Sequence, residues 1–241
     1  MIISILSLLL FMEACAQPTV QIDFGEVKTA GYLVIRGWTQ DSTSNSRKVI
    51  TLDSIHIDTD QKTSYLFQYK KLENPMTIYM QLREKNDTSA AMGTDLFFIN
   101  PHVTFMNWKH GNILLDNNNI KINVLNKDKR MYVADVLGSP ETDVFYILNA
   151  DFVAMYDNTK KTKRRYTNEL DVITNDSLIQ EHPSSKHLLS HIINTSTRYK
   201  NINVLEKHFS LLSKELQGSE DGQKLLSYIT TTKKNNISSS F

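Results

Sequence analysis

The feature that most constrains the fold is a change in the spacing of apolar residues at Ser139-Pro140. Before this point apolar and polar residues alternate, as in half-buried β-strands; after it apolar residues recur every three or four positions, as on a helix. Ser139 is a preferred N-cap residue and Pro140 is favoured at the first helical position. The sequence therefore predicts an α+β protein, with an antiparallel β-sandwich or open barrel at residues 27–137 and a helical segment at residues 138–230.

The first part of the chain fits a series of short strands. Its apolar segments are rich in β-branched and aromatic residues, and turns of Asn, Asp and Gly separate them at spacings of about 8–12 residues, which is typical of a sandwich or barrel. The expected strands cover residues 32–38, 49–58, 64–69, 76–82, 96–99, 103–106, 113–115 and 120–124.

The second part fits several helices, interrupted by capping and breaking residues. The run at 170–181 is expected to end at His182-Pro183, and Ser184 or Ser185 is expected to cap the next helix. A further helix is predicted to open at Asn203, where Glu206 would complete a capping box, and to close at Gly218. A short helix at 225–229 and a flexible tail at 231–241 follow, and the expected core stripe contains Phe152, Leu189, Phe209 and Leu212.

The only cysteine of the chain, Cys15, ends an apolar leader. A membrane-spanning helix needs about 20 apolar residues, so residues 1–14 are too short to span a bilayer and instead fit a signal peptide. A cysteine directly after the small Ala14 resembles the lipobox of bacterial lipoproteins, in which the thiol is acylated and becomes the new N-terminus. Met12 and Glu13 depart from the usual lipobox, so an ordinary secretory leader or a misassigned start codon is the alternative.

The leader and the charge balance limit the classes of function. The sequence predicts a signal peptide at 1–14, a lipid on Cys15, a tether at 15–26 and a membrane-anchored location in the cell envelope, facing the periplasm or the exterior. If Cys15 is acylated, the mature chain has no thiol for a disulfide, a redox pair or a thiolate zinc site. The formal net charge of +1 argues against a nucleic-acid partner, because phosphate binding requires a basic surface.

Several short motifs resemble the N-terminal accessory domain of envelope thiol-disulfide oxidoreductases of the thioredoxin-like, alkyl hydroperoxide reductase/thiol-specific antioxidant type. The resemblance extends from about Val27 to Tyr228. The motifs are Gly37, Leu52-Asp53-Ser54, Tyr65-Leu66-Phe67, Asn74-Pro75 before Thr77–Tyr79, Phe97-Phe98-Ile99, Gly138-Ser139 and Ile179-Gln180-Glu181-His182-Pro183-Ser184-Ser185. In that family a β-rich domain of unknown function and a helical linker precede a thioredoxin fold with a Cys-x-x-Cys pair.

The resemblance implies a location in the cell envelope and a β-rich domain followed by a helical linker, but it implies no catalytic residue. The family's thioredoxin fold is expected to begin where this chain ends, and no position here matches its paired thiols. The leading hypothesis is therefore a non-catalytic binding or docking module of the envelope, without cofactors and with an envelope protein as partner. The alternatives are a truncated or split oxidoreductase whose thioredoxin half lies elsewhere, and a structural lipoprotein without a specific ligand.

Two polar groups are weaker candidates for a site. His187 and His191 are four residues apart on an expected helix, with His182 just before it, and this spacing permits a shared metal ion. Leu188 occupies the position of a zincin's glutamate, so the sequence favours histidines that flank an apolar stripe and no metal site. The basic run Lys160, Lys161, Lys163, Arg164 and Arg165 fits either an anionic membrane surface or, as we favour, a solvated face.

Paired acids and aromatic residues complete the candidates. The pairs Glu220-Asp221 and Asp58-Asp60 lack the companion groups of a glycosidase. Aromatic residues at alternating positions of a sandwich usually belong to the core. Lining of a ligand-binding face is the alternative for Trp38, Trp108, Tyr65 and Phe67.

A single cysteine predicts that the chain has no thiol-disulfide activity of its own. Purified protein without the leader should neither reduce insulin nor turn over peroxide with a dithiol donor, because the chain has no second thiol to form a redox pair with Cys15. Turnover above a buffer control, abolished by replacing Cys15, would contradict this prediction.

Overall fold

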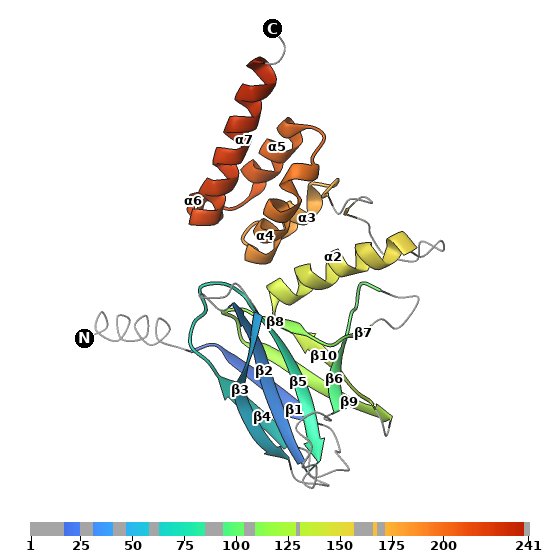
Figure 1. The fold of residues 1–241 in the computed structure, drawn as a ribbon. Coiled ribbons are helices and arrows are strands. Elements are labelled where there is room, and N and C mark those ends of the chain that lie inside the picture. Colours follow the sequence, from blue (N-terminus) through green and yellow to red (C-terminus); the bar gives the residue numbers. More distant parts are fainter. Residues whose placement is uncertain are drawn as a thin grey trace, which may run out of the picture. The chain divides into compact units, whose positions relative to one another are not determined.

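The structure is a computed structural model. It describes residues 17–24, 31–40, 47–57, 63–84, 94–103, 109–128, 131–156, 166–167 and 172–238. The chain divides into two compact units, one from residues 1–98 and 115–139 and one from residues 99–114 and 140–241. The first, here called the β unit, is built of strands, and the second, the helical unit, is built mainly of helices (Figure 1). This arrangement confirms the predicted α+β class with an N-terminal barrel-like sheet.

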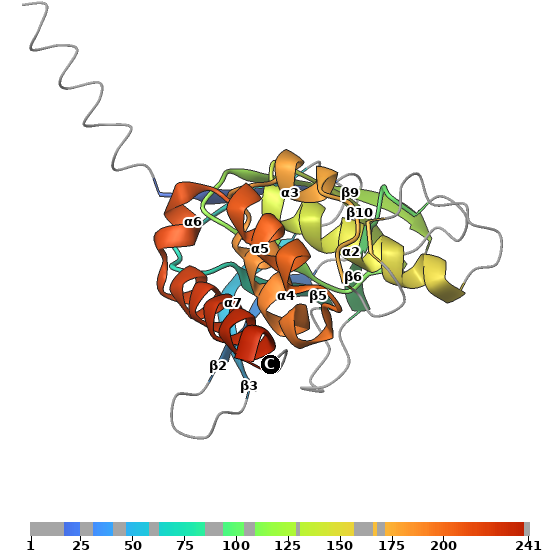
Figure 2. The ribbon, with the colours of Figure 1, turned by 90° about the horizontal axis from the view of Figure 1, so that it is seen from above.

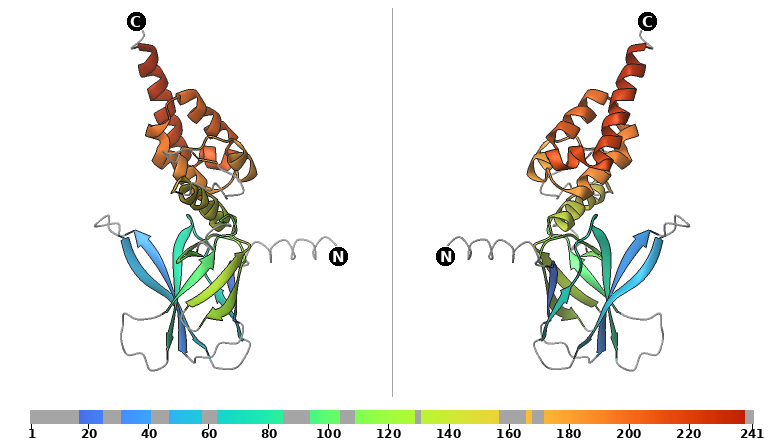
Figure 3. Two further views of the ribbon diagram at one scale, coloured as in Figure 1. Left: turned by 90° about the vertical axis from the view of Figure 1, so that its right-hand side faces the viewer. Right: turned by 90° about the vertical axis from the view of Figure 1, so that its left-hand side faces the viewer.

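Eight strands of the β unit form one mixed sheet in the order β3-β2-β5-β6-β10-β9-β1-β4. Neighbours are antiparallel except for β1 with β9 and β6 with β10, which are parallel, so the sheet is mixed and not wholly antiparallel as predicted. The strands are β1 (Thr19–Phe24), β2 (Gly31–Gln40), β3 (Arg47–Ile57), β4 (Thr63–Gln68), β5 (Met76–Glu84), β6 (Thr94–Ile99), β9 (Ile120–Asp128) and β10 (Met131–Leu137). Figure 3 shows these strands curving around a common interior.

The two ends of this strand order meet, so the sheet is a nearly closed barrel. The hydroxyl of Tyr65 on β4 donates a hydrogen bond to the carbonyl of His56 on β3. Alternate residues of the strands fill the interior and are almost completely buried, and the largest are Phe98, Ile22, Leu33, Ile35, Ile57, Ile78, Met80, Leu96, Ile120 and Ile122. The interior of the barrel is thus occupied by apolar side chains.

The expected tether at 15–26 is wrong in part, because residues 19–24 form strand β1. Val20, Ile22 and Phe24 are buried and alternate with Gln21 and Asp23, so residues 19–24 belong to the core. Of the strand expected at 103–106, Val103 lies outside any strand, and residues 104–106 lie outside the described residues. Strand β10 is additional to the predicted set.

The passage from strand to helix depends on Gly138. Its φ of +84° is in the left-handed region, and a Cβ there would lie 2.4 Å from the carbonyl oxygen of Asn119. The buried Ser139 donates its hydroxyl to Asp116 Oδ2 at 2.8 Å. Helix α2 (Pro140–Tyr156) then begins at Pro140, which confirms the predicted start.

Short helices joined by tight turns make up most of the helical unit. They are α3 (Ser177–Glu181), α4 (Lys186–Thr195), the 3₁₀ turn η1 (Ser196–Arg198), α5 (Ile202–Leu211), α6 (Lys214–Gly218) and α7 (Glu220–Ser238). Helices α4, α5 and α7 lie side by side (Figure 2), and α7 contacts both others. Their shared core contains Leu178, Ile179, Leu188, Leu189, Ile192, Leu205, Phe209, Leu212, Leu216, Leu225 and Ile229.

A buried carboxylate connects α2 to the beginning of α4. Glu141 accepts hydrogen bonds from Ser185 Oγ at 2.6 Å and from the backbone N–H groups of Lys186 at 2.8 Å and His187 at 3.0 Å. Ser185 is also the N-cap residue, because its side chain accepts from Leu188 N. The structure thus confirms Ser185 as the cap, and a carboxylate at a helix N-terminus is favoured by the helix dipole.

Residues 99–114 pack on α2, although the sequence assigned them to the β-rich domain. Asn100 Nδ2 donates to the Tyr146 carbonyl at 2.8 Å, and the ring of His110 stacks on that of Tyr146 with centroids 4.8 Å apart. Leu114 exchanges two hydrogen bonds with the Thr142 hydroxyl. This segment contains β7 (Lys109–His110) and most of β8 (Ile113–Leu115).

The helix boundaries differ from the prediction at four places. Residues 172–176 are not helical, although α3 ends at Glu181 as expected. Asn201 caps α5 in place of the capping box at Asn203, and Ser213 starts a new helix within the predicted 203–218 run. Helix α7 extends through residues 231–238 of the expected tail.

Phe152, expected in the core stripe, is 45% exposed, whereas Phe209 is 7% exposed within the helical core. We therefore predict that Phe209→Ala lowers the free energy of unfolding by about 3–5 kcal/mol, because it leaves a cavity in a packed core. Phe152→Ala is the matched control and should cost much less. Urea denaturation of both variants measures the difference, and equal losses would contradict the assignment of Phe209 to the core.

Candidate functional site

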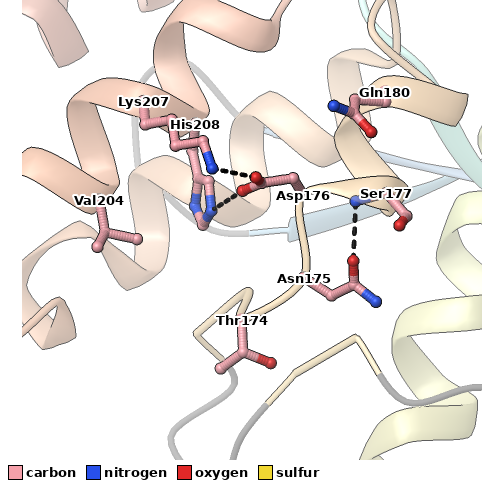
Figure 4. Close-up of a pocket in the computed structure, with 8 residues that line it drawn as sticks. All are labelled: Thr174, Asn175, Asp176, Ser177, Gln180, Val204, Lys207 and His208. Atoms are coloured by element: carbon pink, nitrogen blue, oxygen red, sulfur yellow. Dashed lines mark hydrogen bonds and ion pairs between the residues drawn. The ribbon is translucent and has the colours of Figure 1, made fainter.

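The helical unit contains an open pocket of about 660 Å³ between α3 and α5 (Figure 4). Its walls are polar except for Val204, and Asp176 and His208 lie in direct contact in the wall. The lining residues are Thr174, Asn175, Asp176, Ser177, Gln180, Val204, Lys207 and His208. Asn175 Oδ1 accepts a hydrogen bond from Ser177 N at 3.0 Å and fixes the turn before α3.

His208 is held from both sides of its ring. Its Nε2 lies 3.2 Å from Asp176 Oδ1, and its Nδ1 lies 3.1 Å from the hydroxyl of Tyr199, whose ring meets the imidazole edge to face. Lys207 also donates a hydrogen bond to the second oxygen of Asp176. Since a carboxylate only accepts, Nε2 carries the proton of a neutral ring and Nδ1 accepts from Tyr199.

The surroundings set the charge of each group in this cluster. The hydrogen bond from Lys207 lowers the pKa of Asp176 below its ordinary value, so the group is a carboxylate at neutral pH. Burial lowers the pKa of His208 and outweighs the attraction of Asp176, and burial raises the pKa of Tyr199. A neutral imidazole therefore lies between a phenol and a carboxylate.

The arrangement acts as a clamp that joins α3, α5 and the turn after η1. Both ring nitrogens of His208 are engaged within the protein, and the residue is only 1% exposed. A general base needs a nitrogen within hydrogen-bond reach of its substrate. In this geometry His208 has no nitrogen left for that purpose, so the pocket is better suited to holding the helices together.

One of the histidines suggested by the sequence, His182, lies near a second cluster in the helical unit. His182 Nε2 is 3.9 Å from Asp143 Oδ2, while His102 Nε2 is 2.7 Å from Oδ1 of the same carboxylate. The hydrogen bond from His102 lowers the pKa of Asp143. His187 instead packs edge to face against Phe145. Across the described ranges, no three His, Cys, Asp or Glu side chains are grouped so that they could hold a metal ion.

The outer surface of the β unit carries a different candidate, here called the aromatic face. It consists of the residues of β2, β3 and β5 that alternate with those whose side chains fill the barrel interior. They form cross-strand rows: His56, Tyr32 and Arg83 are adjacent in one row, and Thr51, Arg36 and Tyr79 in another. The other described side chains of the face are Trp38, Val49, Ser54, Gln81 and Val34, which lies between Ser54 and Gln81 and is buried.

Two pairs of rings lie at the ends of the aromatic face. Trp38 is 40% exposed and its ring centroid is 6.0 Å from that of Tyr79. Tyr32 is 41% exposed and its ring centroid is 5.1 Å from that of His56. The prediction that such aromatic residues belong to the core is therefore wrong for Trp38 and correct for Phe67, which is buried, while Tyr65 is half-buried at the barrel seam.

Arg36 lies between the two ring pairs. Its side chain is half-buried, and it makes no ion pair or hydrogen bond to any residue that the structure describes; its Nε is buried without a partner. An isolated, partly desolvated guanidinium favours binding of an anion. Sequence reasoning did not single out Arg36, although it shares the odd-even phase of Trp38 and Tyr32 on β2.

Other candidates from the sequence do not contribute to either site. Glu220 and Asp221 lie on α7, where each pairs with Lys224. The remaining candidates lie outside the described residues: Cys15, Asp58, Asp60, Trp108, Lys160, Lys161, Lys163, Arg164 and Arg165.

Comparisons with known proteins found no relative of this chain. No family model matches the chain, and no curated protein has a similar sequence. Within the described residues, none of the helices is long and apolar enough to cross a membrane.

The buried histidines predict that the helical unit loses stability in weak acid. Burial lowers the pKa of His110 and His187 to about 4, and that of His208 in the same direction. The unfolded chain binds these protons near pH 6.5 and the folded chain only at lower pH, so acid favours unfolding. Between about pH 6.5 and pH 4, His110 and His187 should each remove up to about 1.4 kcal/mol of unfolding free energy per pH unit, and His208 acts in the same direction.

Urea denaturation at pH 7 and pH 5 measures this effect, and the midpoint should be lower at pH 5. The His187→Gln variant should show a weaker dependence, because it lacks one of the titrating groups. Equal or higher stability at pH 5 would contradict the prediction.

Proposed function

We propose that this chain is an exported, lipid-anchored protein of the cell envelope that binds a partner through the aromatic face and has no catalytic activity of its own. The observation that carries the binding role is the cluster of exposed rings around Arg36. Groups of exposed apolar residues on one surface often mark interaction sites, and aromatic residues are enriched at protein–protein interfaces relative to the rest of the surface. The packed barrel interior also supports binding on the outside of the sheet.

The lipid anchor rests on the leader and on Cys15. Strand β1 begins at Thr19, so an acyl group on Cys15 would be joined to the sheet by four residue steps. Such a link spans at most about 14 Å. Under this proposal the β unit is held close to the membrane surface instead of on a long tether.

The absence of catalysis is supported by the pairing of polar groups in the pocket. His208 has both ring nitrogens engaged, and Lys207 pairs with Asp176. The chain also has one cysteine, so any thiol-disulfide chemistry would need thiols from another chain. The resemblance to the accessory region of thioredoxin-like oxidoreductases stays compatible with a module that serves such an enzyme in trans.

Lipidation is tested by mass spectrometry of the mature N-terminus. We expect the mature chain to start at Cys15 and to carry acyl chains, and we expect Cys15→Ser to leave the membrane fraction. Ser4→Ala, a similarly small change inside the leader, is the control and should keep the protein in the membrane fraction. A mature peptide that begins before Cys15, or an unmodified Cys15, would overturn the anchor.

A further inference from the structure

We infer that the aromatic face binds an acidic polysaccharide, a chain of sugars that carry carboxylates such as uronic acids. This inference rests on the proposed binding role and names the ligand's chemistry. It follows from three properties of the face: two separated ring pairs, cationic groups between and beside them, and uncharged side chains in the remaining positions.

The ring pairs provide two platforms for sugar rings. Tyr32 and Trp38 are six residues apart on one strand, which corresponds to about 20 Å along β2. Each carries a neighbouring ring from the adjacent strand, His56 beside Tyr32 and Tyr79 beside Trp38. A pyranose presents a patch of C–H groups that packs on an aromatic ring while its hydroxyls stay in water. Two platforms at this separation fit a linear chain of several sugars.

The cationic groups select for acidic sugars. Arg36 lies opposite Tyr79 and Arg83 lies opposite Tyr32, so each platform has a guanidinium in its own or the adjacent row. Arg36 has no carboxylate partner among the described residues. A guanidinium binds a carboxylate with two parallel hydrogen bonds, which a neutral sugar cannot offer.

The other residues of the face are compatible with a hydroxylated chain. Thr51, Ser54 and Gln81 supply uncharged donors and acceptors, and none of the residues that β2, β3 and β5 turn to this face within the described ranges is acidic. Asp95 on the neighbouring β6 accepts a hydrogen bond from Gln81 at 2.8 Å, and Asp53, in the other phase of β3, accepts one from Ser54 N at 2.7 Å. The face is therefore cationic, polar and aromatic without an internal counter-charge for Arg36.

Single-stranded nucleic acid also combines stacking with negative charge, but the observations favour the glycan. Proteins that bind nucleic acid strands follow the phosphates with a basic groove, whereas the described side chains of this face include two arginines and the chain has a net charge of +1. A glycan carries carboxylates on individual sugars, whereas a nucleic acid carries a phosphate at every nucleotide. The first arrangement fits isolated arginines better.

Isothermal titration calorimetry of the full chain in detergent, with polygalacturonate as the probe, tests the inference. Dextran, polyglutamate and single-stranded poly(dT) are the comparison ligands. We expect binding of polygalacturonate in preference to all three. Arg36→Gln and Trp38→Ala should each weaken it tenfold or more. The control variants on other strands, Lys121→Gln for the lost cation and Leu66→Ala for the lost exposed apolar group, should bind as the parent does.

Each other outcome overturns a defined part of the inference. Equal binding of dextran would remove the role of Arg36 in selecting acids, and preference for poly(dT) or polyglutamate would replace the glycan. Binding that survives both Arg36→Gln and Trp38→Ala, with circular dichroism unchanged, would place the site elsewhere. No binding of polygalacturonate by a chain that carries its lipid on Cys15 would overturn the ligand assignment alone; an unmodified Cys15 would overturn the anchor alone.

Discussion

The β unit depends on the insertion of β1 between β9 and β4. This strand of six residues pairs in parallel with β9 and antiparallel with β4, so it joins the last hairpin to the final strand of the order. Its Val20, Ile22 and Phe24 also fill the barrel interior. Without β1 the remaining strands would leave β4 unpaired on that side and would expose part of the core. A closed and filled barrel then restricts any ligand of this unit to its outer surface.

The sequence predicted those features that depend on local pattern, and it missed those that depend on distant partners. The change of period at Pro140 and the cap at Ser185 are local, because each follows from a few neighbouring residues. Strand β1 has only three alternating apolar residues, and its assignment requires the partners β9 and β4. Asn201 replaced Asn203 as a cap because the choice between two Asn residues depends on where the preceding turn ends.

The candidate sites show the same division between local and distant information. Tyr32, Arg36 and Trp38 share one phase of β2. Because Arg36 is charged, its place in that phase indicates that Trp38 also faces outward. The other phase, Leu33 and Ile35, is apolar and fills the barrel. The clamp at His208 gave no such sign, since Asp176 and Tyr199 come from separate turns and meet the imidazole only in the folded helical unit.

The polar side chains of the pocket are already paired within the protein, whereas the Arg36 side chain of the aromatic face is not. In the pocket, Asp176, Lys207 and His208 pair with one another, so a ligand would have to compete with those pairs. On the aromatic face, the Arg36 side chain has no such pair among the described residues, so an anion can bind to it without breaking an existing contact of that side chain. Two ring pairs and two guanidinium groups suit modest affinity for one stretch of ligand. A polymer with repeated acidic sugars, engaged by several copies held at one membrane surface, would convert that modest affinity into stable attachment through high effective concentration. Under both proposals, a short anchor on Cys15 and a polymeric ligand would support each other physically, because the first would concentrate the binding faces and the second would offer them repeated sites.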